Sequence, residues 1–140
     1  MWSRARVKGW WLLGLLGAVV MVAVLAATRS AASDAEVKVQ RGLASWYGPG
    51  FHGEETASGK IFNQNEMVAA HRTLPLGSVI RVTNLENGRR VTLRVIDRGP
   101  YGRNFRNGTI VDVSRGAARR LGFIRDGLVR VRLDVISVPE

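Results

Sequence analysis

The chain opens with an apolar stretch, residues 9–27, that contains no charged side chain, and its remainder alternates short apolar and polar runs. As a helix this stretch would be roughly 28 Å long, close to the ~30 Å hydrocarbon core of a bilayer. Its apolar side chains surround the helix on every side, which argues against a helix packed on one face of a small domain. The pattern therefore predicts a signal peptide or a transmembrane anchor within residues 1–30. Small residues from Ser30 onwards leave cleavage open.

The charges before the apolar stretch predict its orientation. Arg4, Arg6 and Lys8 precede it, and basic flanking residues stay on the cytoplasmic side of a membrane segment. We therefore expect the rest of the chain to be exported to the periplasm or cell envelope. It would be either released there or anchored in the inner membrane by residues 9–27.

The chain beyond this segment predicts a linker and one folded domain. Residues 31–40 are small and polar, as in a tether, and residues 41–138 form the predicted domain. Short strand-like runs separated by glycine occur at residues 42–47, 67–71, 78–84, 90–97, 110–113 and 128–136. The pattern is that of a small, mainly β domain with one short helix, preceded by the N-terminal hydrophobic helix.

Two local signals are more specific than this alternation. Asn87 and Gly88 predict a hairpin between the third and fourth runs, because both residues accept a positive φ. Ser114 predicts the start of a helix that continues to Leu121 and ends at Gly122.

Composition excludes several classes of protein. The 140 residues include no cysteine, so disulfides, cysteine metal sites and a lipid anchor on cysteine are excluded. The formal net charge of +10 suits an anionic polymer, although solubility alone would also account for it. Nucleic acid is the usual first candidate for a basic domain, but export argues against it. We expect no metal and no other cofactor.

Several motifs in one order carry a resemblance to a known family. They are Gly-Leu-Ala-Ser-Trp-Tyr-Gly at 42–48, Ala-Ala-His-Arg-Thr-Leu-Pro-Leu-Gly at 69–77, Asp-Arg-Gly-Pro at 97–100 and Ile-Val-Asp-Val-Ser at 110–114. Together they resemble the rare lipoprotein A (RlpA) family over nearly all of the predicted domain. The resemblance implies a double-psi β-barrel, the fold of barwin and expansin domains. It also implies endolytic lytic transglycosylation of peptidoglycan glycan strands, with wall proteins of the division site as further partners.

That reaction needs a carboxyl group that acts first as an acid and then as a base. It protonates the glycosidic oxygen and then takes the proton of the sugar's own 6-hydroxyl, so that a 1,6-anhydro-muramic end forms without water. Its pKa must be raised toward neutrality by burial or a neighbouring charge. The resemblance implies His71 and Asp97 as catalytic residues, and it places the acidic residue, a glutamate, where this chain has Lys60.

The replacement at Lys60 leaves two functions open. An ammonium with a reference pKa of about 10.4 donates a proton poorly near neutral pH. Activity would then need a desolvated Lys60, or Glu54 or Glu55 in its place. The alternative is a barrel that binds peptidoglycan or loosens the wall without cleaving it, with Lys60 gripping the lactyl carboxylate of a muramic acid.

Further residues are expected to bind substrate. They are Lys60, Thr56, Tyr47, Arg98, Tyr101 and Asp112. Asp112 resembles a groove-lining aspartate of expansins, although a charge at a helix N-terminus explains it about as well. Tyr47 is predicted to be exposed for stacking on sugar rings, with Trp46 buried in the core.

Overall fold

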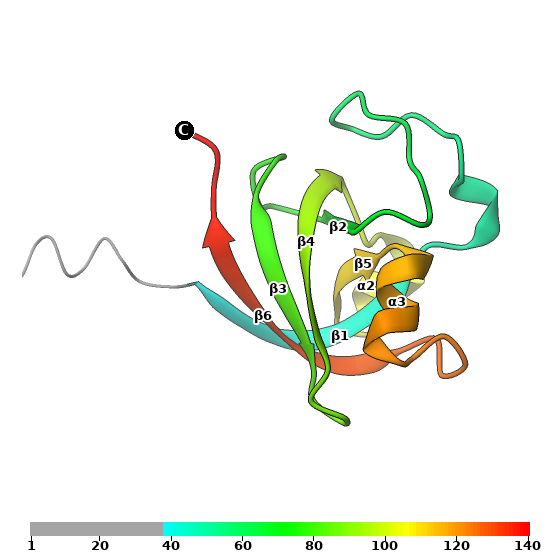
Figure 1. Cartoon of the computed structure of the whole chain (residues 1–140), viewed down its shortest axis with the longest axis vertical. Coiled ribbons are helices and arrows are strands. Elements are labelled where there is room, and N and C mark those ends of the chain that lie inside the picture. The colour runs from blue at the N-terminus through cyan, green and yellow to red at the C-terminus, as the bar shows by residue number, and fades with distance from the viewer. Residues whose placement is uncertain (1–37) are drawn as a thin grey trace, which may run out of the picture. The chain divides into compact units, whose positions relative to one another are not determined.

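The computed structural model describes residues 38–140, which form a closed barrel of six strands. The strands follow the order β1-β5-β2-β4-β3-β6 around the barrel (Figure 1). Their bounds are β1 (Val39–Trp46), β2 (Val68–His71), β3 (Val79–Asn84), β4 (Arg90–Asp97), β5 (Thr109–Val113) and β6 (Val129–Ser137). The helical elements are the 3₁₀ turn η1 (Pro49–Phe51), α2 (Gly102–Arg106) and α3 (Arg115–Leu121).

Closure of the barrel joins segments that are distant in the sequence. β1 pairs in parallel with β5, and β2 in parallel with β4, whereas the remaining pairings around the barrel are antiparallel. Each parallel pair is interrupted by a register shift, at residues 43–44 of β1 and 69–70 of β2. These two irregularities decide which side chains reach the outer wall of the barrel.

Alternation along the strands fills the barrel interior with apolar side chains. Ile80, Val82, Leu93, Val131 and Leu133 are all buried there, because every second residue of a strand points to the same face. Burial of each such side chain contributes about 1.5–3 kcal/mol relative to exposure. The predicted strands at 78–84, 90–97 and 128–136 are β3, β4 and β6 with small differences at their ends.

The two specific local predictions are confirmed. Gly88 adopts a φ of 76° in the turn between β3 and β4, and its N–H donates to Asn84 O at 2.8 Å. Ser114 caps α3 by accepting the N–H of Ala117, and Gly122 ends it in the left-handed region with φ 80°. The mainly β fold with a short helix is therefore as predicted, whereas η1 and α2 were not predicted from the sequence.

A small second cluster of apolar side chains lies outside the barrel. Tyr47, Phe62, Val68, Ala70 and Ile96 form it beneath the segment that joins β1 to β2. Part of that segment folds into a hairpin over residues 53–62, which we call the covering hairpin. The N–H of Gly53 donates to Phe62 O at 2.9 Å, and the N–H of Phe62 donates to Glu54 O at 2.7 Å.

The predicted N-terminal segment of residues 1–30 and most of the predicted linker lie outside the described residues. In the part of the chain that the structure describes, no helix has the length and apolar character needed to cross a membrane.

Candidate functional site

Two aspartates are brought together on the outer wall of the barrel. Ala70 of β2 pairs with Asp97 of β4 on one side and with Asp112 of β5 on the other. Asp97 reaches this position because the register between β2 and β4 passes from Val95 directly to Asp97. A β-bulge of this kind turns the next side chain to the other face, so Asp97 lies outside the barrel although Val95 lies inside.

Three donors hold the carboxylate of Asp97. The Tyr47 hydroxyl donates to its Oδ2 at 2.9 Å, and the N–H groups of Ala57 and Arg98 donate to its Oδ1 at 3.0 and 2.8 Å. Burial and the adjacent Asp97 raise the pKa of Tyr47 above its ordinary value, so the phenol remains a donor at any physiological pH. Asp97 is therefore a fixed acceptor with both oxygens engaged.

Asp112 lies in a different environment. The Ser45 hydroxyl, from the neighbouring β1, donates to its Oδ1. Burial raises the pKa of Asp112 above its usual range, the Ser45 hydrogen bond opposes this, and the charge of Asp97 adds to it. Asp112 is thus a carboxyl group whose environment favours the protonated form, which is a property that an acid catalyst requires.

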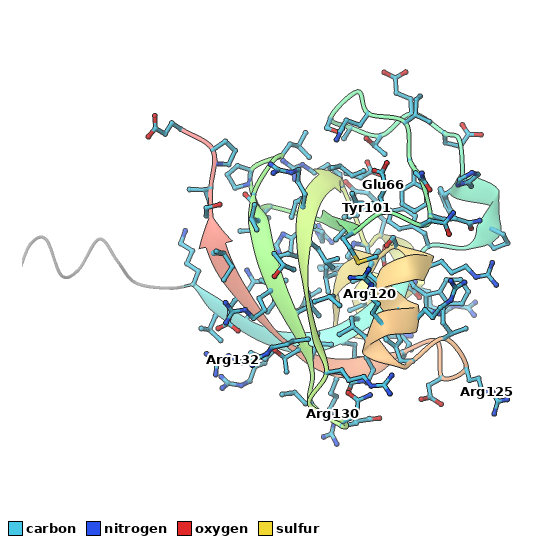
Figure 2. The ribbon with its side chains drawn as sticks, viewed as in Figure 1. Glu66, Tyr101, Arg120, Arg125, Arg130 and Arg132 are labelled. Carbon is cyan, nitrogen blue, oxygen red and sulfur yellow. The ribbon has the colours of Figure 1, made fainter. Side chains whose placement is uncertain are left out.

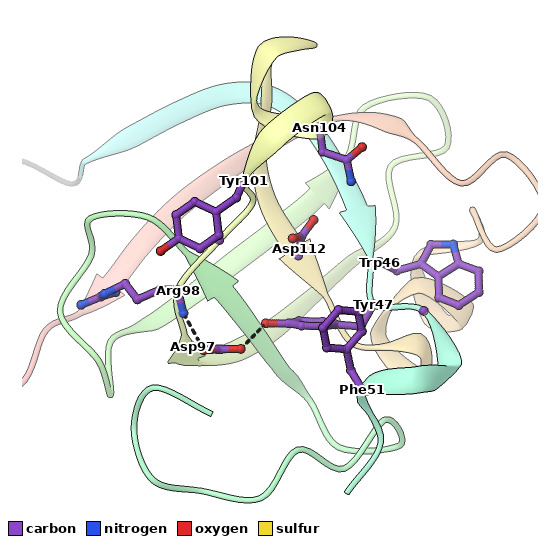
Figure 3. Close-up of a pocket in the computed structure, with 10 residues that line it drawn as sticks. Trp46, Tyr47, Phe51, Asp97, Arg98, Tyr101, Asn104 and Asp112 are labelled. Carbon is purple, nitrogen blue, oxygen red and sulfur yellow. Dashed lines mark hydrogen bonds between the residues drawn. The ribbon is translucent and has the colours of Figure 1, made fainter. Parts of the chain in front are cut away.

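A cleft of about 340 Å³ opens over this pair. Its lining residues are Trp46, Tyr47, Gly48, Phe51, Asp97, Arg98, Gly99, Tyr101, Asn104 and Asp112. Figure 3 shows Asp97 and Asp112 at its floor, with Phe51 and Tyr101 on either side. Phe51 and Tyr101 are 53% and 62% exposed, so their ring faces are available to the apolar faces of a sugar.

The covering hairpin borders the site beside Asp97. Its tip is fixed by the Ala57 N–H on Asp97 and by the Ser58 N–H, which donates to Ile96 O at 3.1 Å. Lys60 follows on this hairpin with an exposed side chain that is not among those lining the cleft. The Thr56 hydroxyl is buried and donates to Lys60 O at 2.7 Å, so it supports the hairpin.

The structure does not bring His71 to the aspartate pair. His71 follows Ala70 on β2 and lines a separate hollow with Gln40, Arg72, Thr73, Phe105, Thr109 and Ile110. Its Nδ1 accepts the N–H groups of Thr73 and Leu74, both at 3.1 Å, so the ring proton is on Nε2 and is donated to Gln40 Oε1 at 3.0 Å. Burial, with a contribution from Arg98, lowers the pKa of His71. His71 is thus a neutral ring that orders the turn after β2.

The other predicted binding residues have distinct positions. Arg98 lines the cleft, but its guanidinium is turned to the backbone, where Nη1 donates to Leu74 O at 2.6 Å and to His71 O at 3.1 Å. Tyr101 lies at the rim of the cleft. The Arg72 guanidinium is 5.8 Å from the centroid of the Tyr101 ring and 3.5 Å from the centroid of the Phe105 ring.

Sequence reasoning misassigned one pair of side chains and missed two others. The predicted burial of Trp46 and exposure of Tyr47 is wrong: Tyr47 is 9% exposed, whereas Trp46 is only partly buried. Tyr47 is covered because its ring packs on Phe62, with centroids 4.5 Å apart. Ser45 and Ala70 were missed, since a serine and an alanine carry no chemical signal until the register places them between the aspartates.

Among residues 38–140, no group of three or more histidine or carboxylate side chains comes together to hold a metal ion.

Solved structures define the class of fold. The chain is similar to Streptomyces papain inhibitor, with TM-score 0.56 and 20% identity over 71% of this chain and 96% of that one. It is similar to the same degree to the apo expansin of Clavibacter michiganensis, over 74% of this chain and 52% of the expansin. The barrel is a double-psi β-barrel, as predicted.

Sequence comparison then identifies the family. The family model described as lytic transglycolase matches residues 39–133. The chain belongs to this family, and its resemblance to RlpA proteins is confirmed.

For two relatives, the match covers only part of their own length. A probable endolytic peptidoglycan transglycosylase RlpA of Synechocystis sp. is 48% identical over 85% of this chain and 37% of its own length. The endolytic peptidoglycan transglycosylase RlpA of Campylobacter jejuni is 54% identical over 69% of this chain and 34% of its own length. The chain thus spans about a third of the length of these relatives.

Proposed function

We propose that this barrel is an endolytic lytic transglycosylase that cleaves peptidoglycan glycan strands in the cell envelope. The observation that carries the proposal is the pair of aspartates, Asp97 and Asp112, at the floor of a cleft with exposed aromatic rings. Membership of the lytic transglycolase family and the names of the RlpA relatives support the same reaction.

Asp112 is the acid and then the base in this proposal. Its raised pKa favours the protonated form that must give a proton to the glycosidic oxygen as the C1–O4 bond breaks. The resulting carboxylate then takes the proton of the 6-hydroxyl while O6 bonds to C1. The products are a 1,6-anhydro-muramic end and a free 4-hydroxyl, and Asp112 is protonated again.

Asp97 stabilises the positive charge that develops on the sugar. The transition state of glycoside cleavage resembles an oxocarbenium ion, which a fixed carboxylate stabilises. Asp97 is suited to this role because three donors hold it in one orientation. The charge of Asp97 also contributes to the raised pKa of Asp112, so the two aspartates act together.

This assignment replaces the roles that the family resemblance implied for other residues. His71 supports the turn after β2 rather than the substrate, because both ring nitrogens are bound by the protein. Glu54 and Glu55 have exposed side chains on the covering hairpin, outside the lining of the cleft. Lys60 is exposed on the same hairpin, and we assign it to contact with an anionic group of the glycan, such as the lactyl carboxylate of muramic acid.

A second function, glycan binding without cleavage, is favoured by Lys60 alone. The family resemblance puts a glutamate there, and Lys60 is exposed on the covering hairpin, which is bound to Asp97 through the Ala57 N–H. A barrel that holds glycan in the same cleft could loosen the wall or locate the protein at a division site.

The sequence suggests how the barrel is delivered to its substrate. We propose residues 1–30 as signal or anchor, residues 31–40 as linker and residues 41–138 as the barrel domain. Residues 9–27 would hold it in the inner membrane if they are not cleaved.

The decisive experiment treats glycan strands with full-length protein purified in mild detergent and searches the products for 1,6-anhydro-muramic ends by mass spectrometry. Wild type, Asp112→Asn, Asp97→Asn and Lys60→Glu are compared at equal concentration. We expect wild type to produce such ends, Asp112→Asn to produce none, and Asp97→Asn to be at least about a hundredfold slower.

Three outcomes separate the alternatives. An inactive wild type that still binds strands, together with an active Lys60→Glu, establishes the binding function. An Asp112→Asn variant as active as wild type removes Asp112 from the mechanism. If neither wild type nor Lys60→Glu produces anhydro ends or binds strands, both functions are wrong.

A further inference from the structure

The outward face of β4, β3, β6 and β1 is rich in arginine. Paired positions across neighbouring strands share a face, and one such row runs Arg90, Thr83, Arg132, Arg41. The next row contains Thr92, Arg81 and Asp134. We call this surface the arginine face, and its arginines are Arg41, Arg81, Arg90, Arg94, Arg130 and Arg132.

This face carries a large positive charge that its own acids do not balance. Its one acid, Asp134, is bound by the Arg132 guanidinium at 2.8 Å. Within residues 38–140 no other ion pair forms on it. Arg130 and Arg132 extend from β6 on the outside of the barrel (Figure 2). A surface of this kind attracts a polyanion.

The arginine face and the cleft are centred on different walls of the barrel, although β1 and β4 contribute side chains to both. In the closed order β1-β5-β2-β4-β3-β6, the strands β5 and β2 that carry Asp112 and Ala70 stand across the barrel from β3 and β6. A partner centred on β3 and β6 therefore leaves Asp112 on β5, and the cleft above it, uncovered.

The chemistry of the face favours a lipid surface over a glycan. Aromatic rings suit the apolar faces of sugars. The exposed rings of Phe51 and Tyr101 line the cleft and that of Phe105 lines the hollow of His71, whereas the arginine face has no exposed aromatic residue. At its edge are two partly exposed apolar residues, Val39 and Ile136, with exposures of 38% and 48%. Cations around apolar side chains are typical of surfaces that dock on anionic membranes.

The position of the chain's N-terminal part supports the same partner. β1, which carries Val39 and Arg41, is the strand that residues 1–37 precede. The apolar residues 9–27, predicted to enter the membrane, are separated from it by residues 28–38. At about 3.5 Å per residue, this connection cannot exceed roughly 40 Å even when fully extended.

We propose that the arginine face docks the barrel on an anionic phospholipid bilayer. Docking centred on β3 and β6 leaves Asp112, and the cleft above it, uncovered. The interaction is electrostatic, so added salt weakens it.

The test uses the absence of cysteine from the chain. A single Thr92→Cys places a fluorescent label on the arginine face, and Glu54→Cys places one on the covering hairpin. Full-length protein is reconstituted in nanodiscs of phosphatidylcholine alone or mixed with phosphatidylglycerol, and quenching by aqueous iodide is measured. We expect the label at residue 92 to be protected in the anionic discs only, and the label at residue 54 to be quenched equally in both.

Charge variants show whether the arginines of this face cause the protection of the label at residue 92. Replacing Arg81, Arg90 and Arg130 together by Gln should lower the ratio of docked to free barrel roughly hundredfold. The matched control replaces Arg119, Arg120 and Arg125, exposed arginines of α3 and the turn that follows it, by Gln, and should retain protection. Far-ultraviolet circular dichroism verifies that both variants are folded.

Three results would overturn the proposal. They are equal quenching of the residue 92 label in the two kinds of disc, equal loss of protection in the two triple variants, and protection by soluble anionic wall polymer but not by anionic discs. The last would assign the face to the wall. None depends on glycan cleavage, so failure here is distinguishable from failure of the proposed function.

Discussion

Asp97 and Asp112 lie on either side of Ala70, because both pair with this one residue in the barrel sheet. Burial raises the pKa of Asp112, the Ser45 hydroxyl opposes the shift, and the charge of Asp97 increases it. The affinity of Asp112 for a proton is therefore set first by burial and then by two neighbours that act in opposite directions.

Substitution of these neighbours should shift the pKa of Asp112 in opposite directions. Ser45→Ala removes a hydrogen bond to the charged form and should raise the pKa further, whereas Asp97→Asn removes a like charge and should lower it. Carbon-13 NMR titration of the Asp112 carboxyl in each variant measures both shifts without requiring activity. Shifts of the same sign would show that these two groups do not control the proton.

The pH dependence of stability should reveal the neutral state of His71. Because its pKa is lowered in the folded protein, the stability it contributes is present above the unfolded value of about 6.5 and is lost as pH falls from there through the folded pKa. Urea unfolding at several pH values should show wild type losing stability over this window, and His71→Asn should lose less.

An independent measurement checks the basis of this expectation. Nitrogen-15 NMR of the ring should show the proton on Nε2, with Nδ1 unprotonated as the acceptor of the Thr73 and Leu74 N–H groups. A proton on Nδ1 at neutral pH would contradict the arrangement.

Local sequence signals predicted the elements of the barrel well. The Asn87–Gly88 turn and the cap at Ser114 depend on neighbouring residues only, and both are observed. The alternation that places Val131 and Leu133 on one face of a strand likewise predicts that this face is buried, and this prediction does not depend on the order of the strands. These features follow from local physical preferences, so one sequence is enough to find them.

The site was less predictable because it depends on register. The bulge beside Ala69 and Ala70 places Asp97 on the outer wall, and simple alternation from Val95 would have put it inside. His71 is a predicted site residue that does not line the cleft. The resemblance predicts that His71 is catalytic, whereas in the structure it follows Ala70 and lines another hollow. The motifs predicted Asp97 and Asp112 as site residues, whereas their common neighbour Ala70 and the hydrogen bond from Ser45 appear only in three dimensions.

A glycine in α3 should resist replacement although helices favour alanine. A Cβ on Gly116 would lie 2.8 Å from the backbone oxygen of Asn65. Relief of this clash requires the backbone to move. Gly116→Ala should therefore lower the free energy of unfolding by a net value of about 1–2 kcal/mol, in which the gain in helix propensity of about 1 kcal/mol is already included. Thermal unfolding measures the change.

Gly50→Ala is the control, since a Cβ there has no neighbour within 4 Å. This substitution should change the free energy of unfolding by no more than about 0.5 kcal/mol. Equal effects of the two changes would contradict the close packing of α3.

The hydrogen bond from Tyr47 to Asp97 should be measurable as a coupling energy. Tyr47→Phe keeps the ring that packs on Phe62 and removes only the donor of the 2.9 Å contact. Crossed with Asp97→Ala in a double-mutant cycle of urea unfolding, it should give about 1 kcal/mol of coupling, because each single change already removes the same hydrogen bond. The control cycle pairs Tyr47→Phe with Asp134→Asn, whose carboxylate is bound by Arg132 on β6, and should be additive within about 0.5 kcal/mol. Additivity in both cycles would show that Tyr47 does not hold Asp97, and the fixed orientation proposed for that carboxylate would then rest on the Ala57 and Arg98 N–H groups alone.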